Sequence, residues 1–94
     1  MTHDKFWDLY NNGEIQVKVW DGEIDGVQKS VEAFEYDGKF FLRIHSVYRY
    51  VTGERKFGKR YRMSKESHFI KEFNSKEHAN AYFKKAAQGL KKVR

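Results

Sequence analysis

Alternation of apolar and polar positions along the first half of the chain predicts β-strands. Ile15, Val17 and Val19 alternate with polar or aromatic neighbours, which is the period-two pattern of a half-buried strand. The segment 21–26 is rich in Asp and Gly and predicts a turn, after which residues 27–36 are expected to form a second strand.

Asp37-Gly38 is the strongest turn signal, because both residues tolerate the positive φ angles of a type I′ turn. A two-residue loop there joins residues 27–36 to a third strand in a fixed register. That register turns one group of residues to the core, namely Val31, Ala33, Leu42 and Ile44. On the opposite, outer face it sets Phe34 beside Phe41 and Glu32 beside Arg43, so Phe34 and Phe41 are expected to be exposed.

Thr52-Gly53 predicts a second hairpin turn. It would pair Ile44 with Tyr61, Leu42 with Met63 and Tyr48 with Phe57, which places Tyr48, Phe57 and Tyr61 in the core. On the outer face the same turn sets His45 opposite Arg60, Arg49 opposite Lys56, Arg43 opposite Arg62 and Val47 opposite Gly58. Like charges in directly opposed positions are unfavourable, and Glu32 is near enough to offset Arg43 only. An external anion is the simplest group to offset the rest.

Helical periodicity is expected at both ends of the chain. Residues 3–11 follow a capping Thr2, and Gly13 is expected to end that helix. After a further strand at 68–73, Asn74 and Glu77 read as a capping box that starts a C-terminal helix. That helix shows one apolar face, made of Ala79, Tyr82, Phe83, Ala86 and Leu90. Gly89 is expected to weaken its last turns, and the basic residues after it suit the negative end of the helix dipole.

These elements predict an α+β fold in a single domain over residues 1–94. An antiparallel sheet of four or five strands is expected, with a short N-terminal helix and a C-terminal helix packed on one face.

Charge is divided unevenly along the chain. Residues 39–63 hold eight Lys or Arg and one acid, a formal charge of +7, whereas the whole chain has +6. Residues 1–38 carry three bases and nine acids, a charge of −6. A concentrated basic segment interleaved with aromatics is the pattern expected of polyanion binding, although a solvated strand surface gives a similar one.

Signals for catalysis, cofactors and membranes are missing from the sequence. The chain has no Cys, and its four His lack the spacing of a metal site. No nucleophile elbow or phosphate-cradling loop is found. We therefore expect neither an enzyme nor a cofactor. No long apolar run or apolar signal core occurs, so no membrane association and a cytoplasmic location are expected.

The favoured function is a non-catalytic nucleic-acid-binding protein that uses the basic outer face. The candidate binding residues are Phe34, Phe41, Arg43, His45, Arg49, Lys56, Lys59, Arg60 and Arg62. The basic C-terminal tail would add long-range attraction. The alternative is a protein-binding inhibitor or adaptor of a mobile element or phage, directed at a nucleoprotein machine. There the acidic residues Glu14, Asp21, Glu23 and Asp25 would occupy a partner's nucleic-acid site. The sequence does not distinguish DNA from RNA as the ligand, and it does not give the oligomeric state.

The segment 73–83, Phe-Asn-Ser-Lys-Glu-His-Ala-Asn-Ala-Tyr-Phe, resembles the strand-to-helix passage of WGR-type DNA-binding domains. The Trp-Gly-Arg tripeptide of that family is absent, and Phe57-Gly58-Lys59 is its nearest approach. A capped amphipathic helix gives the same pattern without kinship, so no function is carried over.

Overall fold

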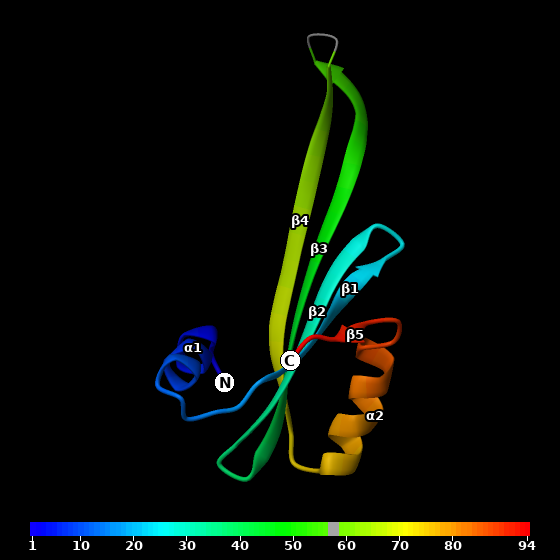
Figure 1. Cartoon of the computed structure of the whole chain (residues 1–94). Helices are drawn as coiled ribbons and strands as arrows, with labels where there is room; N and C mark the ends of the chain where they lie inside the picture. The colour runs from blue at the N-terminus through cyan, green and yellow to red at the C-terminus, as the bar shows by residue number, and fades with distance from the viewer. Residues whose placement is uncertain (57–58) are drawn as a thin grey trace.

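A five-stranded antiparallel sheet lies between two helices, one on each side (Figure 1). The computed structural model describes residues 1–56 and 59–94, with side chains described at 1–48 and 65–94. The elements in chain order are α1 (His3–Asn11), β1 (Lys18–Ile24), β2 (Val27–Tyr36), β3 (Lys39–Lys56), β4 (Lys59–Phe73), α2 (Lys76–Ala86) and β5 (Lys91–Lys92). The strand order is β4-β3-β2-β1-β5. The predicted α+β class and both terminal helices are confirmed.

The β2–β3 hairpin has the predicted turn and register. Asp37 and Gly38 have φ angles of 52° and 73°, and Val31 lies opposite Ile44. The same turn chemistry recurs between β1 and β2, where Asp25 and Gly26 have φ angles of 52° and 77°. β1 therefore continues through most of the segment that was predicted to be a turn.

One half of the core lies between α2 and the sheet. Val31, Leu42 and Ile44 are buried there with Ala86, and Tyr82 packs against them. This face of the sheet is the core face that the β2–β3 register predicted.

The start of α2 lies one residue later than predicted. Ser75 is the N-cap, because the Ala79 N–H donates to the Ser75 carbonyl at 3.1 Å and no earlier residue accepts the first helical bond. The predicted capping box of Asn74 and Glu77 is therefore wrong. Ser75 has extended backbone angles and makes no side-chain cap bond.

The C-terminal residues form a strand instead of the last helical turns. α2 ends at Ala86, and Gly89, with φ of 81°, reverses the chain. Lys91 and Lys92 then pair with Asp21 and Trp20 of β1. The expected position of these lysines at the end of the helix dipole is wrong, because the chain turns back to satisfy the open edge of β1.

The other half of the core lies between α1 and the opposite face of the sheet. The helix is capped as predicted, since the Lys5 N–H donates to the Thr2 hydroxyl at 3.1 Å. Phe6 and Leu9 are buried against Phe34 and Phe41, which are only 5% and 4% exposed. The predicted exposure of these two phenylalanines is wrong, because α1 covers the face that the sequence left open.

The antiparallel pairing of β3 with β4 is confirmed, but the predicted position of its turn is wrong. β3 runs through Thr52 and Gly53 to Lys56, and a register shift lies between Val51 and Arg55. The long β4 brings Ile70 into contact with the α1 cluster and Phe73 into contact with the α2 cluster, and a turn at Thr52-Gly53 would forfeit both contacts.

The predicted pairs on β3 change accordingly. The observed partners are Arg43 with Ile70, His45 with His68, Val47 with Glu66, Leu42 with Lys71, Ile44 with Phe69, Tyr48 with Lys65, Arg49 with Ser64 and Lys56 with Lys59.

The β3–β4 ladder extends beyond the rest of the sheet (Figure 1). Pairing between β2 and β3 ends at Val27 and Tyr48, whereas β3 and β4 pair as far as Lys56 and Lys59. We call residues 49–64 the β3–β4 ribbon.

Candidate nucleic-acid interface

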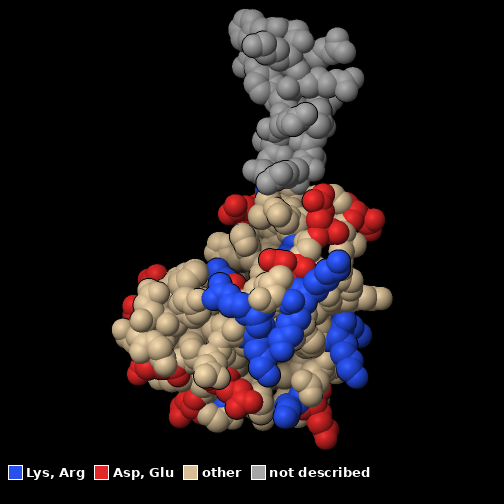
Figure 2. All heavy atoms as spheres, in the orientation of Figure 1, with Lys and Arg blue, Asp and Glu red and all other residues tan. Residues whose placement is uncertain are grey.

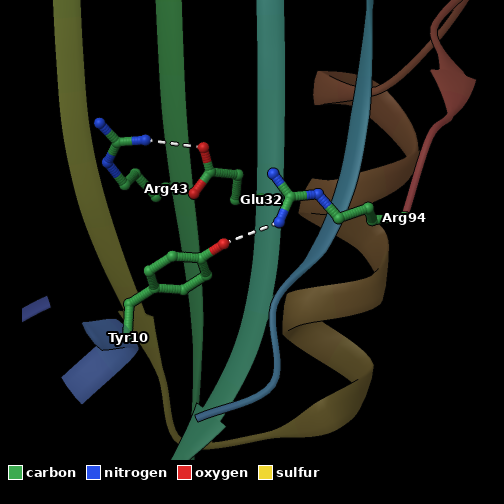
Figure 3. Close-up of polar contacts among 4 residues, drawn as sticks. All are labelled: Tyr10, Glu32, Arg43 and Arg94. Carbon is green, nitrogen blue, oxygen red and sulfur yellow. Dashed lines mark hydrogen bonds and ion pairs between the residues drawn. The ribbon is translucent and has the colours of Figure 1, made fainter. Parts of the chain in front are cut away.

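Arg43, a predicted phosphate contact, is engaged inside the protein. Its Nη1 donates to Glu32 Oε1 at 2.7 Å, and both side chains are largely buried (Figure 3). The guanidinium also lies 5.0 Å from the ring centre of Phe6 and 5.2 Å from that of Trp7. The predicted role of Glu32 in offsetting Arg43 is confirmed, and Arg43 has little surface left for an external anion.

The C-terminal residue also contacts the α1 side of the molecule. Arg94 Nη1 donates to the Tyr10 hydroxyl at 2.7 Å, which links the last residue of the chain to α1 (Figure 3).

His45 lies on the same side of the sheet in acidic surroundings. Its Nε2 is 3.9 Å from Glu66 Oε2, and its ring centre is 6.1 Å from that of His68. A shallow hollow next to it is lined partly by Asp21 and Glu23. Three carboxylates thus lie near His45, and its cross-strand partner is His68, not the Arg60 that the predicted register placed there.

His3 extends this histidine cluster onto α1. Its ring meets His68 edge to face at 4.4 Å, and its Nε2 is buried without a hydrogen-bond partner. Burial lowers the pKa of His3 below its ordinary 6.5, and the nearby His68 and Arg43 lower it further, while Asp4 acts in the opposite direction.

Aromatic rings and lysines lie on the part of the α2 side of the sheet that the helix does not cover. Tyr48 and Phe69 are 44% and 41% exposed there. The predicted core position of Tyr48 is wrong, because Tyr48 lies opposite Val27, the first residue of β2, and α2 packs nearer the other end of the strands. Lys65 lies directly opposite Tyr48, and Lys71 extends its Nζ to 4.4 Å from the Tyr82 ring centre.

Register decides which residues share this surface. Residues two apart on a strand face the same side of the sheet. Tyr48 and Ser46 therefore lie on the α2 side together with Ile44, and Lys29 lies there together with Val31. Directly opposite residues also share a side, which adds Phe69, Ser67 and Lys65. We call the group Lys29, Tyr48, Lys65, Phe69 and Lys71 the lysine face.

Charge therefore separates between the two faces. Lys29, Lys65 and Lys71 carry the charge of the lysine face, and the exposed Glu35 lies on the same side of the sheet, nearer the β2–β3 turn. On the other side of the same strands lie Asp21, Glu23 and Glu66. Figure 2 shows acidic side chains gathered where the β1–β2 hairpin ends and basic ones around the C-terminal segment.

The β3–β4 ribbon continues from the lysine face. Its sequence holds six Lys or Arg and one Glu, a formal charge of +5. Five predicted binding residues belong to it, and their side chains lie outside the described part of the structure: Arg49, Lys56, Lys59, Arg60 and Arg62. The side chains of Phe57 and Tyr61, which were predicted in the core, also lie outside the described part of the structure.

Sequence reasoning missed the residues that β4 contributes. Lys65, Ser67, Phe69 and Lys71 share one side of β4, but residues 65–71 show no alternation of apolar and polar positions, and the sequence predicted a strand only over 68–73. The turn predicted at Thr52-Gly53 also separated this segment from its partners on β3.

Other features add no further site. Where side chains are described, no group of three or more His, Cys, Asp or Glu is placed to hold a metal ion. None of the helices in the described chain has the length and apolar character needed to cross a membrane. Comparisons with protein-family models, with curated proteins and with solved structures find no match to this chain.

Proposed function

We propose that this protein binds nucleic acid through the lysine face and the β3–β4 ribbon, without catalysing a reaction. One observation carries the proposal. The ladder that holds Lys65, Phe69 and Lys71 on one side continues beyond the sheet into a segment with a sequence charge of +5. Positive charge concentrated along one ladder attracts a phosphate backbone.

The separation of charge supports this orientation. The α1 side of the sheet carries Asp21, Glu23 and Glu66, so a polyanion is repelled there and attracted to the lysine face. Lysine supplies a compact charge for phosphate without a demand for one bonding geometry. The candidate surface thus moves from the face that the sequence predicted to the opposite one.

Fluorescence anisotropy with a labelled oligonucleotide tests the proposal. Lys65→Glu is expected to weaken binding, since it reverses an exposed charge on the lysine face. Lys5→Glu is the matched control, because Lys5 is equally an exposed lysine but lies on α1, on the other side of the sheet. Equal effects of the two changes would contradict the assigned face.

A protein partner is the second candidate function. Three of the four acidic residues predicted for that role, Asp21, Glu23 and Asp25, are exposed on the β1–β2 hairpin, which supports this candidate. Asp21→Asn with Glu23→Gln is expected to leave nucleic-acid binding intact if the first proposal holds. Loss of a co-purifying protein, resistant to nuclease, would favour the second.

The cytoplasm is the proposed location. The chain has no Cys, and its stability depends on packing, which suits a reducing compartment.

A further inference from the structure

Two exposed aromatic side chains lie on the lysine face. Attraction between lysines and phosphates does not explain why they are exposed. Tyr48 and Phe69 keep nearly half of their surface in contact with solvent, although both are on the α2 side of the sheet. α2 covers only the other end of this side (Figure 1). An exposed ring on a flat sheet surface can receive the face of an unpaired base.

The spacing of the two rings suits an extended strand of nucleic acid. Phe69 lies opposite Ile44, and Tyr48 is four residues farther along β3, which corresponds to about 13 Å. Stacked bases are only about 3.4 Å apart, so one base on each ring leaves room for nucleotides between them. The pair between the rings is Ser46 and Ser67, whose side chains are too short to block that path.

Lysines lie beside both rings. Lys65 is opposite Tyr48, and Lys71 is two residues from Phe69 on the same side of β4. Lys29 lies across from Ser46 on β2. A phosphate backbone that follows the rings would therefore stay close to positive charge along its whole path.

We propose that the lysine face binds single-stranded nucleic acid, with unpaired bases stacked on Phe69 and Tyr48 and phosphates next to Lys29, Lys65 and Lys71. This inference rests on the proposed function and adds the class of nucleic acid. A duplex fits poorly, because its bases are stacked inside the helix and offer only their edges in the grooves. Rings on a broad sheet surface cannot reach those edges.

Anisotropy titrations of the full chain with two probes test the inference. The probes are a fluorescein-labelled oligothymidine of about a dozen nucleotides and its duplex with oligoadenosine. Phe69→Leu removes the flat ring and keeps an apolar side chain. It is expected to weaken oligothymidine binding about 5-fold or more and to leave duplex binding unchanged.

Salt dependence separates stacking from charge. Phe69→Leu is expected to leave the slope of log K against log salt unchanged, because stacking releases no counterions. Lys65→Gln is expected to reduce that slope by about 0.7 for the single strand, the value for one phosphate contact. Trp7→Leu is the matched aromatic control, since Trp7 is exposed on α1 and should not affect either probe.

The outcomes distinguish the two proposals. Parental oligothymidine affinity in Phe69→Leu, or tighter binding of the duplex, overturns the single-strand inference, and a Lys65 effect on both probes would still uphold nucleic-acid binding. If neither probe binds at about 50 mM salt, the proposed function itself fails. Unchanged circular dichroism and denaturant midpoints confirm that the variants are folded.

Discussion

Ile44 and Phe69 lie directly opposite each other on β3 and β4, yet Ile44 is 5% exposed and Phe69 is 41% exposed. The difference arises because Ile44 lies on the inner strand β3 within the α2-side core, whereas Phe69 lies on the edge strand β4, outside that core. One cross-strand pair thus joins the core to the proposed binding surface. Packing and recognition can therefore be separated by substitutions at neighbouring positions.

Phe34 and Phe41 should be as important for stability as the α2-side core. Their rings stack at a centroid distance of 5.2 Å beneath α1. Phe34→Ala and Phe41→Ala are each expected to lower the free energy of unfolding by about 3 to 5 kcal/mol, because a large buried ring leaves a cavity. Denaturant melts measure the loss. Phe69→Ala is the control, and a loss there as large as at Phe34 would contradict the assigned faces.

The Glu32–Arg43 pair is expected to behave as a buried ion pair. Glu32→Gln should lower stability by about 2 to 5 kcal/mol, since it leaves the Arg43 charge without its partner between Phe6 and Trp7. Glu32→Leu combined with Arg43→Met should recover much of that loss. If the double variant were less stable than Glu32→Gln, the pair would contribute more than its desolvation cost.

Gly89 is expected to tolerate a side chain less well than Gly13. Its φ is 81°, and a Cβ there would meet Ile24 Cδ1 at 2.9 Å. Gly13 has φ of 70° with nothing within 4 Å of such a Cβ. Gly89→Ala should therefore lower the free energy of unfolding more than Gly13→Ala does. At Gly13 the loss comes only from backbone strain of about 1 to 3 kcal/mol. Thermal melts of both variants would show the order, and equal losses would mean that Ile24 moves aside.

Stability should decline at mildly acidic pH through His3. Because the pKa of His3 is lowered on folding, the unfolded chain binds its proton more readily than the folded one. The contribution of His3 to the free energy of unfolding is therefore fully present above pH 6.5. It is lost as the pH falls toward the lowered pKa of the folded state, and at still lower pH it changes no further. His3 faces His68 on β4 and Arg43 on β3, and Asp4 lies beside it.

Urea melts at about pH 8 and about pH 5 measure this effect. His3→Gln cannot titrate, so it should lose less stability between the two pH values than the parent does. An unchanged difference would show that His3 does not contribute.

Sequence patterns predicted the elements whose signals are local. The β2–β3 register follows from Asp37 and Gly38, and α1 from Thr2 and the spacing of Phe6, Trp7 and Tyr10. These signals act over a few residues, so distant contacts did not alter them.

The errors came from long-range packing. Thr52-Gly53 is a plausible turn, but Ile70 and Phe73 gain contacts with both helices only if β3 continues past it. Likewise, no local signal showed that α1 would cover Phe34 and Phe41. The proposed binding surface therefore lies on the opposite side of the sheet from the predicted one.

The most direct test of nucleic-acid binding by the lysine face is a salt titration of oligothymidine binding for the parent chain, Lys65→Glu and Lys5→Glu. The account predicts binding by the parent that weakens linearly in log K against log salt, a clear loss in Lys65→Glu and parental affinity in Lys5→Glu. No binding by the parent at about 50 mM salt, or equal losses in the two variants, would contradict it.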